Sequence, residues 1–293
     1  MICLTGDVHH MSLRCNDQRF LTEPGDTEVK VAQRYVALLE RYQVKATLYV
    51  CGKCFTEEWP DLEPVVKSAL IEVGGHGFRA RQPRKLFDWY GRHTGNWNGP
   101  RVYQAWDIRK NVQVCEKRTG HRPVAWRAHS YKVDPNTYPL LAHYGFKLVS
   151  DEVSADNLWP QRIENGLISH PMNVIPDHDH LYHAHRDREF VEAANRRGYG
   201  ADAFGAVSYE IEKWGRLVLE QAQAIEDQGG LVTILAHPIC MYLADGFKTF
   251  ERLLEYLAAR PTIWAREIID LVDDSPAALE AAEHARDKGT IRK

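Results

Sequence analysis

The sequence predicts an α/β fold, a distorted (β/α) barrel of about seven parallel strands covered by helices. Two observations predict it. Strand-like and helix-like segments alternate along most of the chain, and no internal repeat or low-complexity linker interrupts them. Such alternation is typical of a parallel sheet with helices packed on it. We expect a single domain over residues 1–273, followed over residues 274–293 by a helical or disordered tail rich in alanine and charge.

Each expected element has its own local signal. The expected strands are apolar or β-branched runs at residues 1–6, 45–51, 124–126, 146–149, 231–236 and 262–264, with an irregular strand from residue 166. The expected helices carry apolar residues at helical spacing or turn residues at their ends, and they span 26–42, 61–73, 104–120, 134–144, 204–228, 247–259 and 265–272. Asp26, Thr27 and Glu28 suit the first turn of one helix, and Gly74, like Gly145, marks a helix end.

The composition excludes several classes of protein. The 293 residues are 44% hydrophobic and 26% charged, with 37 basic against 40 acidic side chains, so no basic excess suggests a nucleic-acid partner. No apolar run reaches the roughly 20 residues that span a bilayer. The first residues enter a strand without the pattern of a signal peptide, and six cysteines in such a chain indicate reduced thiols. We therefore expect a cytoplasmic protein.

Reactive side chains are concentrated where the expected strands end. In a (β/α) barrel the catalytic groups lie at the carboxyl ends of the strands, in the loops that follow them. The side chains found there are Asp7, His9, His10, His76, Arg127, His129, Asp151 and His237. This distribution predicts an active site at that end of the barrel.

Five short motifs carry a resemblance to a known family. They read LTGDVHH from residue 4, KATLYV from residue 45, GHGFRA from residue 75, WRAHSY from residue 126 and TILAHP from residue 233. In this order and spacing the chain resembles the polysaccharide deacetylase family, whose catalytic unit is the NodB homology domain, over about residues 2–272. The resemblance implies a metal-dependent deacetylase. The chain departs from the pattern at Val8 and Ala80, where the family has metal ligands, and at His129, where it has proline.

The catalytic residues that we expect follow from these motifs. Amide hydrolysis needs an activated water and a proton for the leaving amine. Asp7 is the expected base and His237 the expected acid, while Asp151 is expected to orient His237. The resemblance implies that Arg127 pairs with Asp7 and keeps it ionised. The alternatives are a strand-end cap for Asp7, a surface position for Arg127 and a packed core histidine at position 237.

The expected metal ligands are His9, His76, His10 and Asp7. Asp7 and His9 lie two residues apart on a strand and so share one face. On the shifted register of divergent family members, His9 would replace the ligand missing at Val8. Imidazole and carboxylate ligands together suit a divalent metal, with zinc the expected one. The alternative is that the metal site has been lost and these histidines only form hydrogen bonds.

Three other regions bear on substrate binding. The expected substrate-binding residues are His129, Tyr131, Trp89, Trp97, Asp177 and Asp179. Trp89 and Trp97 belong to an insert over residues 81–101, whose aromatic and basic side chains suit a sugar ring, or else pack as an ordinary loop. The histidine-rich stretch over residues 170–185 predicts a second metal site, a polar substrate wall or a solvated loop. Cys51 and Cys54 have redox spacing, but we interpret them as structural.

Together these observations predict a hydrolase of a carbon–nitrogen amide bond other than a peptide bond. The expected substrate is an N-acetylated amino sugar or a related small molecule, and the resemblance implies metal-dependent deacetylation in carbohydrate metabolism. One alternative is a metal-independent amide or ureide hydrolase of the same fold, and another is a barrel that binds carbohydrate without turnover. We expect no nucleic-acid or membrane partner, and the sequence leaves a homo-oligomer open.

Overall fold

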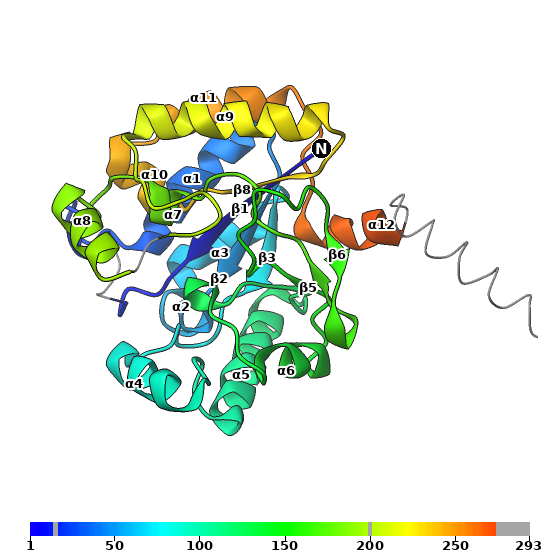
Figure 1. Ribbon diagram of the computed structural model, residues 1–293. Helices are drawn as coiled ribbons and strands as arrows, with labels where there is room; N and C mark the ends of the chain where they lie inside the picture. The colour runs from blue at the N-terminus through cyan, green and yellow to red at the C-terminus, as the bar shows by residue number, and fades with distance from the viewer. Residues whose placement is uncertain (14–16, 199–200, 274–293) are drawn as a thin grey trace, which may run out of the picture.

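The described chain forms one curled, mostly parallel sheet with helices packed on it (Figure 1). The computed structural model describes residues 1–13, 17–198 and 201–273. The strands of this part are β1 (Ile2–Val8), β2 (Ala46–Val50), β3 (Ile71–Gly75), β4 (Ala125–Trp126), β5 (Leu148–Val149), β6 (Gln161–Arg162), β7 (Ile168–Ser169) and β8 (Val232–Leu235). Their order in the sheet is β6-β7-β5-β4-β3-β2-β1-β8, and only the β6–β7 pair is antiparallel. The predicted fold class is confirmed.

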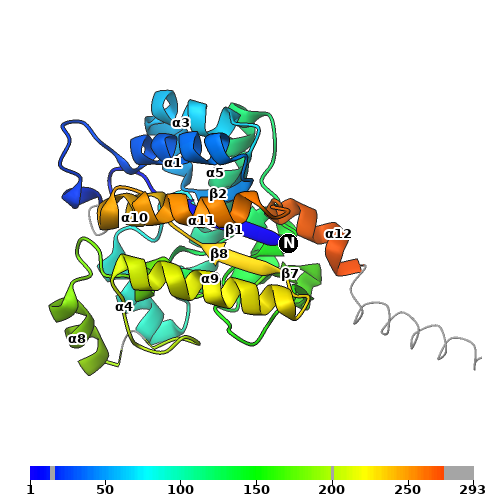
Figure 2. The same ribbon diagram turned by 90° about the horizontal axis from the view of Figure 1, so that it is seen from above.

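Helices surround the outer side of this sheet. They are α1 (Glu28–Tyr42), α2 (Gly52–Glu57), α3 (Trp59–Lys67), α4 (Arg84–Thr94), α5 (Arg101–Thr119), α6 (Thr137–His143), α7 (Asp177–His180), α8 (Arg188–Arg196), α9 (Ile211–Asp227), α10 (Pro238–Asp245), α11 (Lys248–Ala258) and α12 (Ile268–Asp273). Four short 3₁₀ turns accompany them, η1 (Asp17–Phe20), η2 (His129–Tyr131), η3 (Glu164–Gly166) and η4 (Ala265–Glu267). Successive neighbours in contact are α9, α11, α1, α3, α2, α5 and α6 (Figure 1). The view from above shows the first four of them, α9, α11, α1 and α3, one after another (Figure 2).

The central strands are buried on both faces, which explains their continuous apolar sequence. All seven residues of β1 are buried, and so are all five of β2. The largest hydrophobic cluster lies between these strands and the helices, and Trp214 of α9 and Tyr35 of α1 are fully buried in it. Parallel strands covered by helices need apolar residues on both faces. This packing fixes the strand ends that carry the reactive side chains.

Two glycines bring the strands close enough to form that edge. A Cβ atom at Gly75 would lie 2.7 Å from the Trp126 ring and 2.9 Å from the Asn111 side chain. A Cβ atom at Gly6 would lie 2.9 Å from the Ala236 carbonyl oxygen. These contacts are too short for any side chain, so β3 can lie against β4, and β1 against β8, only with glycine at these positions.

Several predicted boundaries were wrong for local reasons. The helix expected over residues 61–73 ends at Lys67, and its last residues belong to β3. The strand expected over 262–264 forms only a single bridge, between Thr262 and Ile2. The helices α2, α4, α7, α8 and α10 were not predicted, and α4 lies in the insert over residues 81–101. The expected tail over 274–293 lies outside the described residues.

Candidate active site

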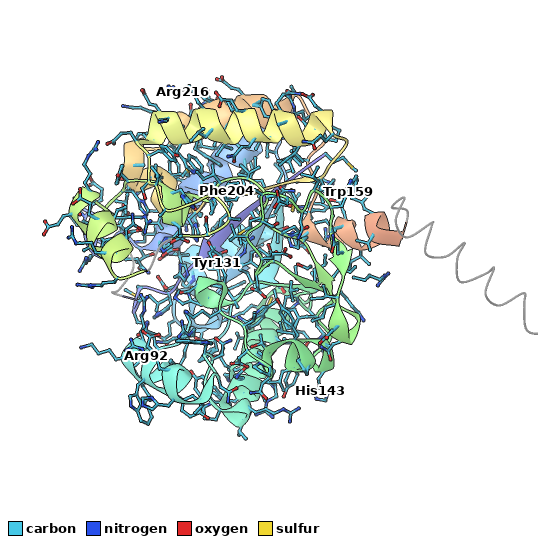
Figure 3. The ribbon with its side chains drawn as sticks, viewed as in Figure 1. Arg92, Tyr131, His143, Trp159, Phe204 and Arg216 are labelled. Carbon is cyan, nitrogen blue, oxygen red and sulfur yellow. The ribbon has the colours of Figure 1, made fainter. Side chains whose placement is uncertain are left out.

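Four strand ends bring reactive side chains together at one edge of the sheet. Asp7 belongs to β1, His76 follows β3, Arg127 follows β4 and His237 follows β8. Two of them, Asp7 and His237, line a cavity of about 200 Å³ together with His9, Arg84, His129, Ser130, Tyr131, His178 and Asp179. Figure 3 labels Tyr131 near the middle of the molecule and Arg92 of α4 at the lower left of the molecule. This cavity lies at the strand ends where the active site was expected, and we treat it as the candidate active site.

Arg127 binds the carboxylate of Asp7 inside the protein. Its side chain is fully buried, and Nη1 donates to Asp7 Oδ1 at 3.0 Å. The other guanidinium donors bind the Thr5 hydroxyl at 3.0 Å, the Ser150 hydroxyl at 2.8 Å and the Ser150 carbonyl at 3.0 Å. The guanidinium also lies over the Tyr49 ring, 4.4 Å from its centroid. These contacts fix both the guanidinium and the carboxylate that it holds.

The charge state of Asp7 follows from its neighbours. Burial alone would raise the pKa of this carboxyl, but His76, Arg127 and His237 outweigh burial and lower its pKa well below the usual value. Arg127 carries its positive charge at every relevant pH. Asp7 is therefore an anion at neutral pH, as a general base must be.

His237 links Asp7 to a second carboxylate, Asp177. Its Nε2 lies 3.3 Å from Asp7 Oδ2, and its Nδ1 lies 2.7 Å from Asp177 Oδ1. The main-chain nitrogen of His237 also donates to Asp177 Oδ2 at 2.5 Å. Burial lowers the pKa of His237, but Asp177 and then Asp7 outweigh it and raise that pKa well above its usual value. His237 is therefore a cation that faces the cavity and can donate a proton there.

The structure changes the roles expected for two aspartates. Asp151, expected to orient His237, instead accepts a hydrogen bond from the main-chain nitrogen of Ala128 at 2.5 Å. Asp177, expected to bind substrate, is fully buried and holds His237. The reason is topological: Asp151 follows β5, which lies in the sheet beyond β4, whereas α7 brings Asp177 to the end of β8.

His9 and His76 point their Nε2 atoms at each other, 3.1 Å apart. Nδ1 of His76 donates to the Arg127 carbonyl oxygen at 2.7 Å, because a carbonyl can only accept. Burial lowers the pKa of His76 to about 4, so its Nε2 carries a lone pair at neutral pH. Nδ1 of His9 lies 2.9 Å from the buried carboxylate of Glu28, which also accepts from the His9 main-chain nitrogen at 3.0 Å. When both rings are neutral, two lone pairs therefore face each other.

A divalent metal fits this arrangement of donors. Histidine ligands in metal sites usually donate their second nitrogen to a carboxylate or a carbonyl, as His9 and His76 do here. Asp7 Oδ2 lies 3.6 Å from His76 Nε2. The Cys51 thiol is a further neighbour, since ligand atoms of His9, Cys51 and His76 all lie within 4.8 Å of one another. His9, His76 and either Asp7 or Cys51 could thus hold a cation.

His10, also expected as a ligand, lies outside this group. The strand ends at Val8, and the chain turns so that His10 Nε2 lies 3.1 Å from Glu57 and 3.6 Å from Glu58. Its Nδ1 lies 2.8 Å from the Ser12 hydroxyl. Its imidazole therefore pairs with the end of α2 and does not complete the metal site.

Of the six expected substrate-binding residues, three line the cavity and three do not, Asp177, Trp89 and Trp97. His129, Tyr131 and Asp179 line it. The ring of His129 stands edge-on to His9 and His76, with centroids 5.1 and 5.5 Å away. Trp89 is 57% exposed on α4 and stacks with His93, while Trp97 packs on Gly91 and Lys132. Both tryptophans thus make contacts within the insert or next to it, and neither lines the cavity.

Sequence reasoning gave no site role to Glu28, Asp17 or Cys240, and it treated His178 only as part of the histidine-rich stretch. Glu28 was interpreted only as part of a helix start, although a buried glutamate in a first turn is a signal for a second role. His178 lines the cavity, and Asp17 and Cys240 lie close to it in a cluster with His183. Only the density of histidines over residues 170–185 pointed to this cluster. Its members come from distant segments, so no local spacing could reveal it.

Comparisons with known proteins agree with this fold. The family model described as polysaccharide deacetylase matches residues 23–149. No curated protein sequence matches significantly. Among solved structures, the chain is similar to a Mycobacterium smegmatis protein assigned to the polysaccharide deacetylases, with a TM-score of 0.66 and 16% identity over 93% of this chain and 90% of that one.

Two further structures share the fold. PuuE allantoinase has a TM-score of 0.63 and 12% identity over 94% of this chain and 91% of its own. A Pseudomonas aeruginosa PAO1 protein assigned to the polysaccharide deacetylases has a TM-score of 0.62 and 14% identity over 94% and 92%. The family match over residues 23–149 and the shared fold together support a deacetylase-like hydrolase.

Proposed function

We propose that this protein hydrolyses a carbon–nitrogen amide bond other than a peptide bond, by deacetylating an N-acetylated amino sugar or a related small molecule. The observation that carries the proposal is the line of contacts from Arg127 through Asp7 and His237 to Asp177. It places an anionic carboxylate and a cationic imidazole side by side at the wall of one cavity. Amide hydrolysis needs this combination of a base and an acid.

In the proposed reaction Asp7 takes a proton from the attacking water. Arg127 holds Oδ1 of this carboxylate, so Oδ2 is the atom left to face the cavity side and His237. As the tetrahedral intermediate collapses, His237 donates its Nε2 proton to the departing nitrogen. Asp177 keeps the imidazole oriented through Nδ1 and stabilises its positive charge.

The same geometry returns the enzyme to its starting state. After one turnover Asp7 carries the proton of the water and His237 is neutral. The 3.3 Å between Asp7 Oδ2 and His237 Nε2 is close to a direct hydrogen bond. The proton can therefore pass from the carboxyl to the imidazole without solvent, which restores the anion and the cation together.

A divalent cation suits the pair of His9 and His76 in this proposal. When bound, it would supply a Lewis acid for the acyl oxygen of the substrate. Glu28 orients His9, and the Arg127 carbonyl orients His76. The donor set of imidazole with carboxylate or thiolate favours zinc among divalent ions.

Cavity dimensions support a small substrate and a small acyl group. The main cavity, about 200 Å³, lies below the range usual for drug-sized ligands. A second cavity of about 40 Å³ shares His129 with it, and its lining includes Ala80, Ile108 and Trp126. A space of this size and apolar character suits the methyl of an acetyl group. We therefore expect acetyl amides to be better substrates than butyryl amides.

The direct test is turnover by the purified full chain on a panel of N-acetylated amino sugars and linear or cyclic ureides. Released amine and released acetate are measured separately. Release of both in equal amounts from at least one amino sugar supports the proposal, and hydrolysis of ureides alone would replace deacetylation by the alternative activity. No turnover on any amide, with binding of sugars retained, would favour a carbohydrate-binding barrel.

Metal analysis tests the role given to His9 and His76. His76→Ala removes one donor and should lower metal content, while Glu28→Gln should weaken binding about 10- to 100-fold by loosening His9. His10→Ala is the matched control, since His10 pairs with Glu57 outside this group. Equal metal content in His76→Ala and wild type, together with activity that survives chelators, would favour a metal-independent hydrolase.

A further inference from the structure

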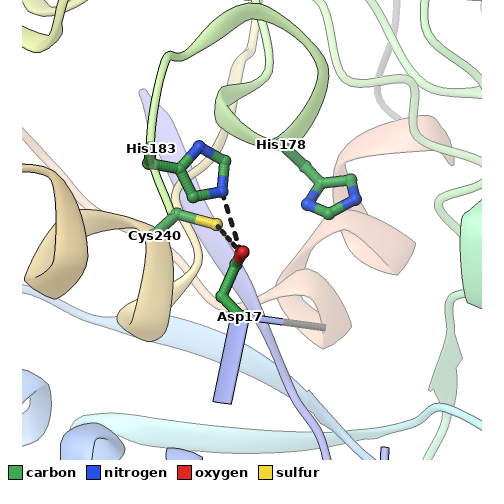
Figure 4. Close-up of side chains that lie close together, drawn as sticks. All are labelled: Asp17, His178, His183 and Cys240. Atoms are coloured by element: carbon green, nitrogen blue, oxygen red, sulfur yellow. Dashed lines mark hydrogen bonds and ion pairs between the residues drawn. The ribbon is translucent and has the colours of Figure 1, made fainter. Parts of the chain in front are cut away.

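A second cluster of metal-binding side chains lies beside the catalytic one. Asp17, His178, His183 and Cys240 place their ligand atoms within 4.8 Å of one another. They come from η1, from α7 and the loop that follows it, and from α10. Figure 4 shows His183 and Cys240 turned toward the Asp17 carboxylate, with His178 on its other side. Segments more than two hundred residues apart in the chain thus meet at one carboxylate.

The contacts of His183 are those of a metal ligand. Its Nδ1 donates to the Leu181 carbonyl oxygen at 2.9 Å, so that nitrogen is already used. Its Nε2 faces Asp17 Oδ2 at 2.9 Å. A neutral imidazole would put a lone pair against an anion there, so a proton or a metal cation must lie between them. A histidine that donates its other nitrogen to a main-chain carbonyl is the usual arrangement at metal sites.

Cys240 and His178 bring the number of donors to four, the number that structural zinc sites use. Cys240 Sγ lies 4.0 Å from Asp17 Oδ2. Ligand atoms around a tetrahedral zinc ion are separated by about 3.3 to 3.8 Å, given bonds of about 2.0 to 2.3 Å. Binding would therefore widen the 2.9 Å between Asp17 Oδ2 and His183 Nε2 slightly and shorten the 4.0 Å between Asp17 Oδ2 and Cys240 Sγ slightly. Asp17 is 1% exposed and Cys240 also 1%, so a cation here would be shielded from water. His185 binds the second oxygen of Asp17 and orients the carboxylate.

A second set of side chains around the Cys240 thiol is less suited to bind a metal ion. Asp177, His237 and Cys240 also lie close together. However, His237 already donates to Asp177 and faces Asp7 with its other nitrogen, so it has no lone pair to offer in the state that catalysis needs. The cluster of Asp17, His178, His183 and Cys240 keeps its donors free of the catalytic chain of contacts.

We propose that Asp17, His178, His183 and Cys240 bind a second, structural divalent transition metal, with zinc the ion that their mixed donors favour. The thiolate and imidazole donors select zinc over magnesium or calcium, which prefer oxygen ligands. The cation joins η1 to α7 and α10 at the rim of the cavity. Since α7 begins with Asp177 and α10 follows His237, the metal stabilises the two segments that hold the acid in place.

Cobalt substitution tests the site independently of activity. Co²⁺ bound by a thiolate gives a charge-transfer absorption that oxygen and nitrogen ligands do not give. The full chain carrying Cys51→Ser, which removes the thiol near His9 and His76, is loaded with Co²⁺. We expect the absorption to remain, and the further change Cys240→Ser to abolish it and to remove one equivalent of bound cobalt. Adding Cys54→Ser instead, a buried thiol outside the cluster, should change neither.

Unchanged cobalt content and absorption after Cys240→Ser would overturn the proposal, and so would the absence of any thiolate band in the Cys51→Ser protein. Folding is checked by circular dichroism. If Cys240→Ser fails to fold, His178→Gln replaces it, because His178 is partly exposed to the cavity. His178→Gln should still lower the affinity for Co²⁺ and reduce the rise in Tm that the ion produces. An unchanged affinity would contradict the site.

Discussion

The Asp177 carboxylate accepts two hydrogen bonds from His237, one from the imidazole Nδ1 at 2.7 Å and one from the main-chain nitrogen at 2.5 Å. One carboxylate thus fixes the ring and the first residue before α10 together. Because the other ring nitrogen, Nε2, faces Asp7, these two hydrogen bonds set the direction of the Nε2 proton of His237. The acid of the proposed reaction therefore depends on a residue that does not itself line the cavity.

Asp177→Asn should shift the alkaline limb of the pH–rate profile to lower pH. The negative charge of Asp177 helps to raise the pKa of His237, so the acid form persists above the usual range of histidine. Asparagine keeps an acceptor for the main-chain nitrogen but removes the charge, and the acid form is then lost at lower pH. The profile of kcat against pH measures the shift.

Asp151→Asn is the matched control for that experiment. Asp151 is also a buried aspartate beside the site, but it accepts its hydrogen bond from the Ala128 main-chain nitrogen and not from His237. Burial raises its pKa to about 7, so on the alkaline limb this carboxyl is an anion too, and asparagine removes a buried charge that does not hold His237. An alkaline limb that moves equally in both variants would show that Asp177 does not act through His237.

Arg127→Met should strongly destabilise the protein. The substitution leaves Asp7 as a buried carboxylate without its guanidinium partner, and breaking such pairs costs about 3 to 5 kcal/mol. In Arg127→Met/Asp7→Asn the uncompensated charge is gone, so the double variant should be more stable than the sum of the two single effects by about 0.5 to 3 kcal/mol. Urea unfolding measures the three free energies.

The control for that cycle is Arg81→Met. Arg81 pairs with Asp88 at 3.0 Å, but Asp88 is 28% exposed, so water can replace the lost partner. Its substitution should destabilise the protein less than Arg127→Met. Strictly additive effects of the Arg127 and Asp7 changes would contradict the assignment of a coupled buried pair.

Part of this architecture could be read directly from the sequence. β1, β2 and β8 are short, mostly apolar or β-branched runs because both faces of these strands are buried, and this pattern predicted them as strands. By contrast, β3 was taken as the end of a helix. Its Glu72 is an acidic residue in a buried strand, and it is satisfied only by Thr47 at 2.7 Å and by the main chain at Arg266. The sequence around Glu72 contains no signal that predicts partners as distant as Thr47 and Arg266.

The site divides in the same way. The parallel sheet alone predicts that side chains at the carboxyl ends of its strands lie at one edge, and this applies to Asp7, His76, Arg127 and His237. The partner of His237 could not be chosen from position, because Asp151 and Asp177 both lie between the expected strands. The choice depends on α7, a single turn of four residues that periodicity cannot detect.

His237→Gln should slow amide hydrolysis by about a hundredfold to ten-thousandfold, the usual contribution of a positioned acid. The loss should shrink for an ester with a good leaving group, since that group departs without a proton. His180→Gln is the control, because His180 is a buried imidazole paired with Asp202 at 2.9 Å and does not line the cavity. Equal losses on both substrates for His237→Gln would assign His237 a structural role.

The central claim is that Asp7 activates the water that attacks the amide. The most direct measurement compares kcat for amide hydrolysis by wild type and Asp7→Asn, with circular dichroism to confirm the fold. Asparagine can still accept from Arg127 but cannot take a proton, so we predict a loss of at least about a hundredfold across the pH range. Turnover by Asp7→Asn at close to the wild-type rate would contradict the account, because the base would then lie elsewhere.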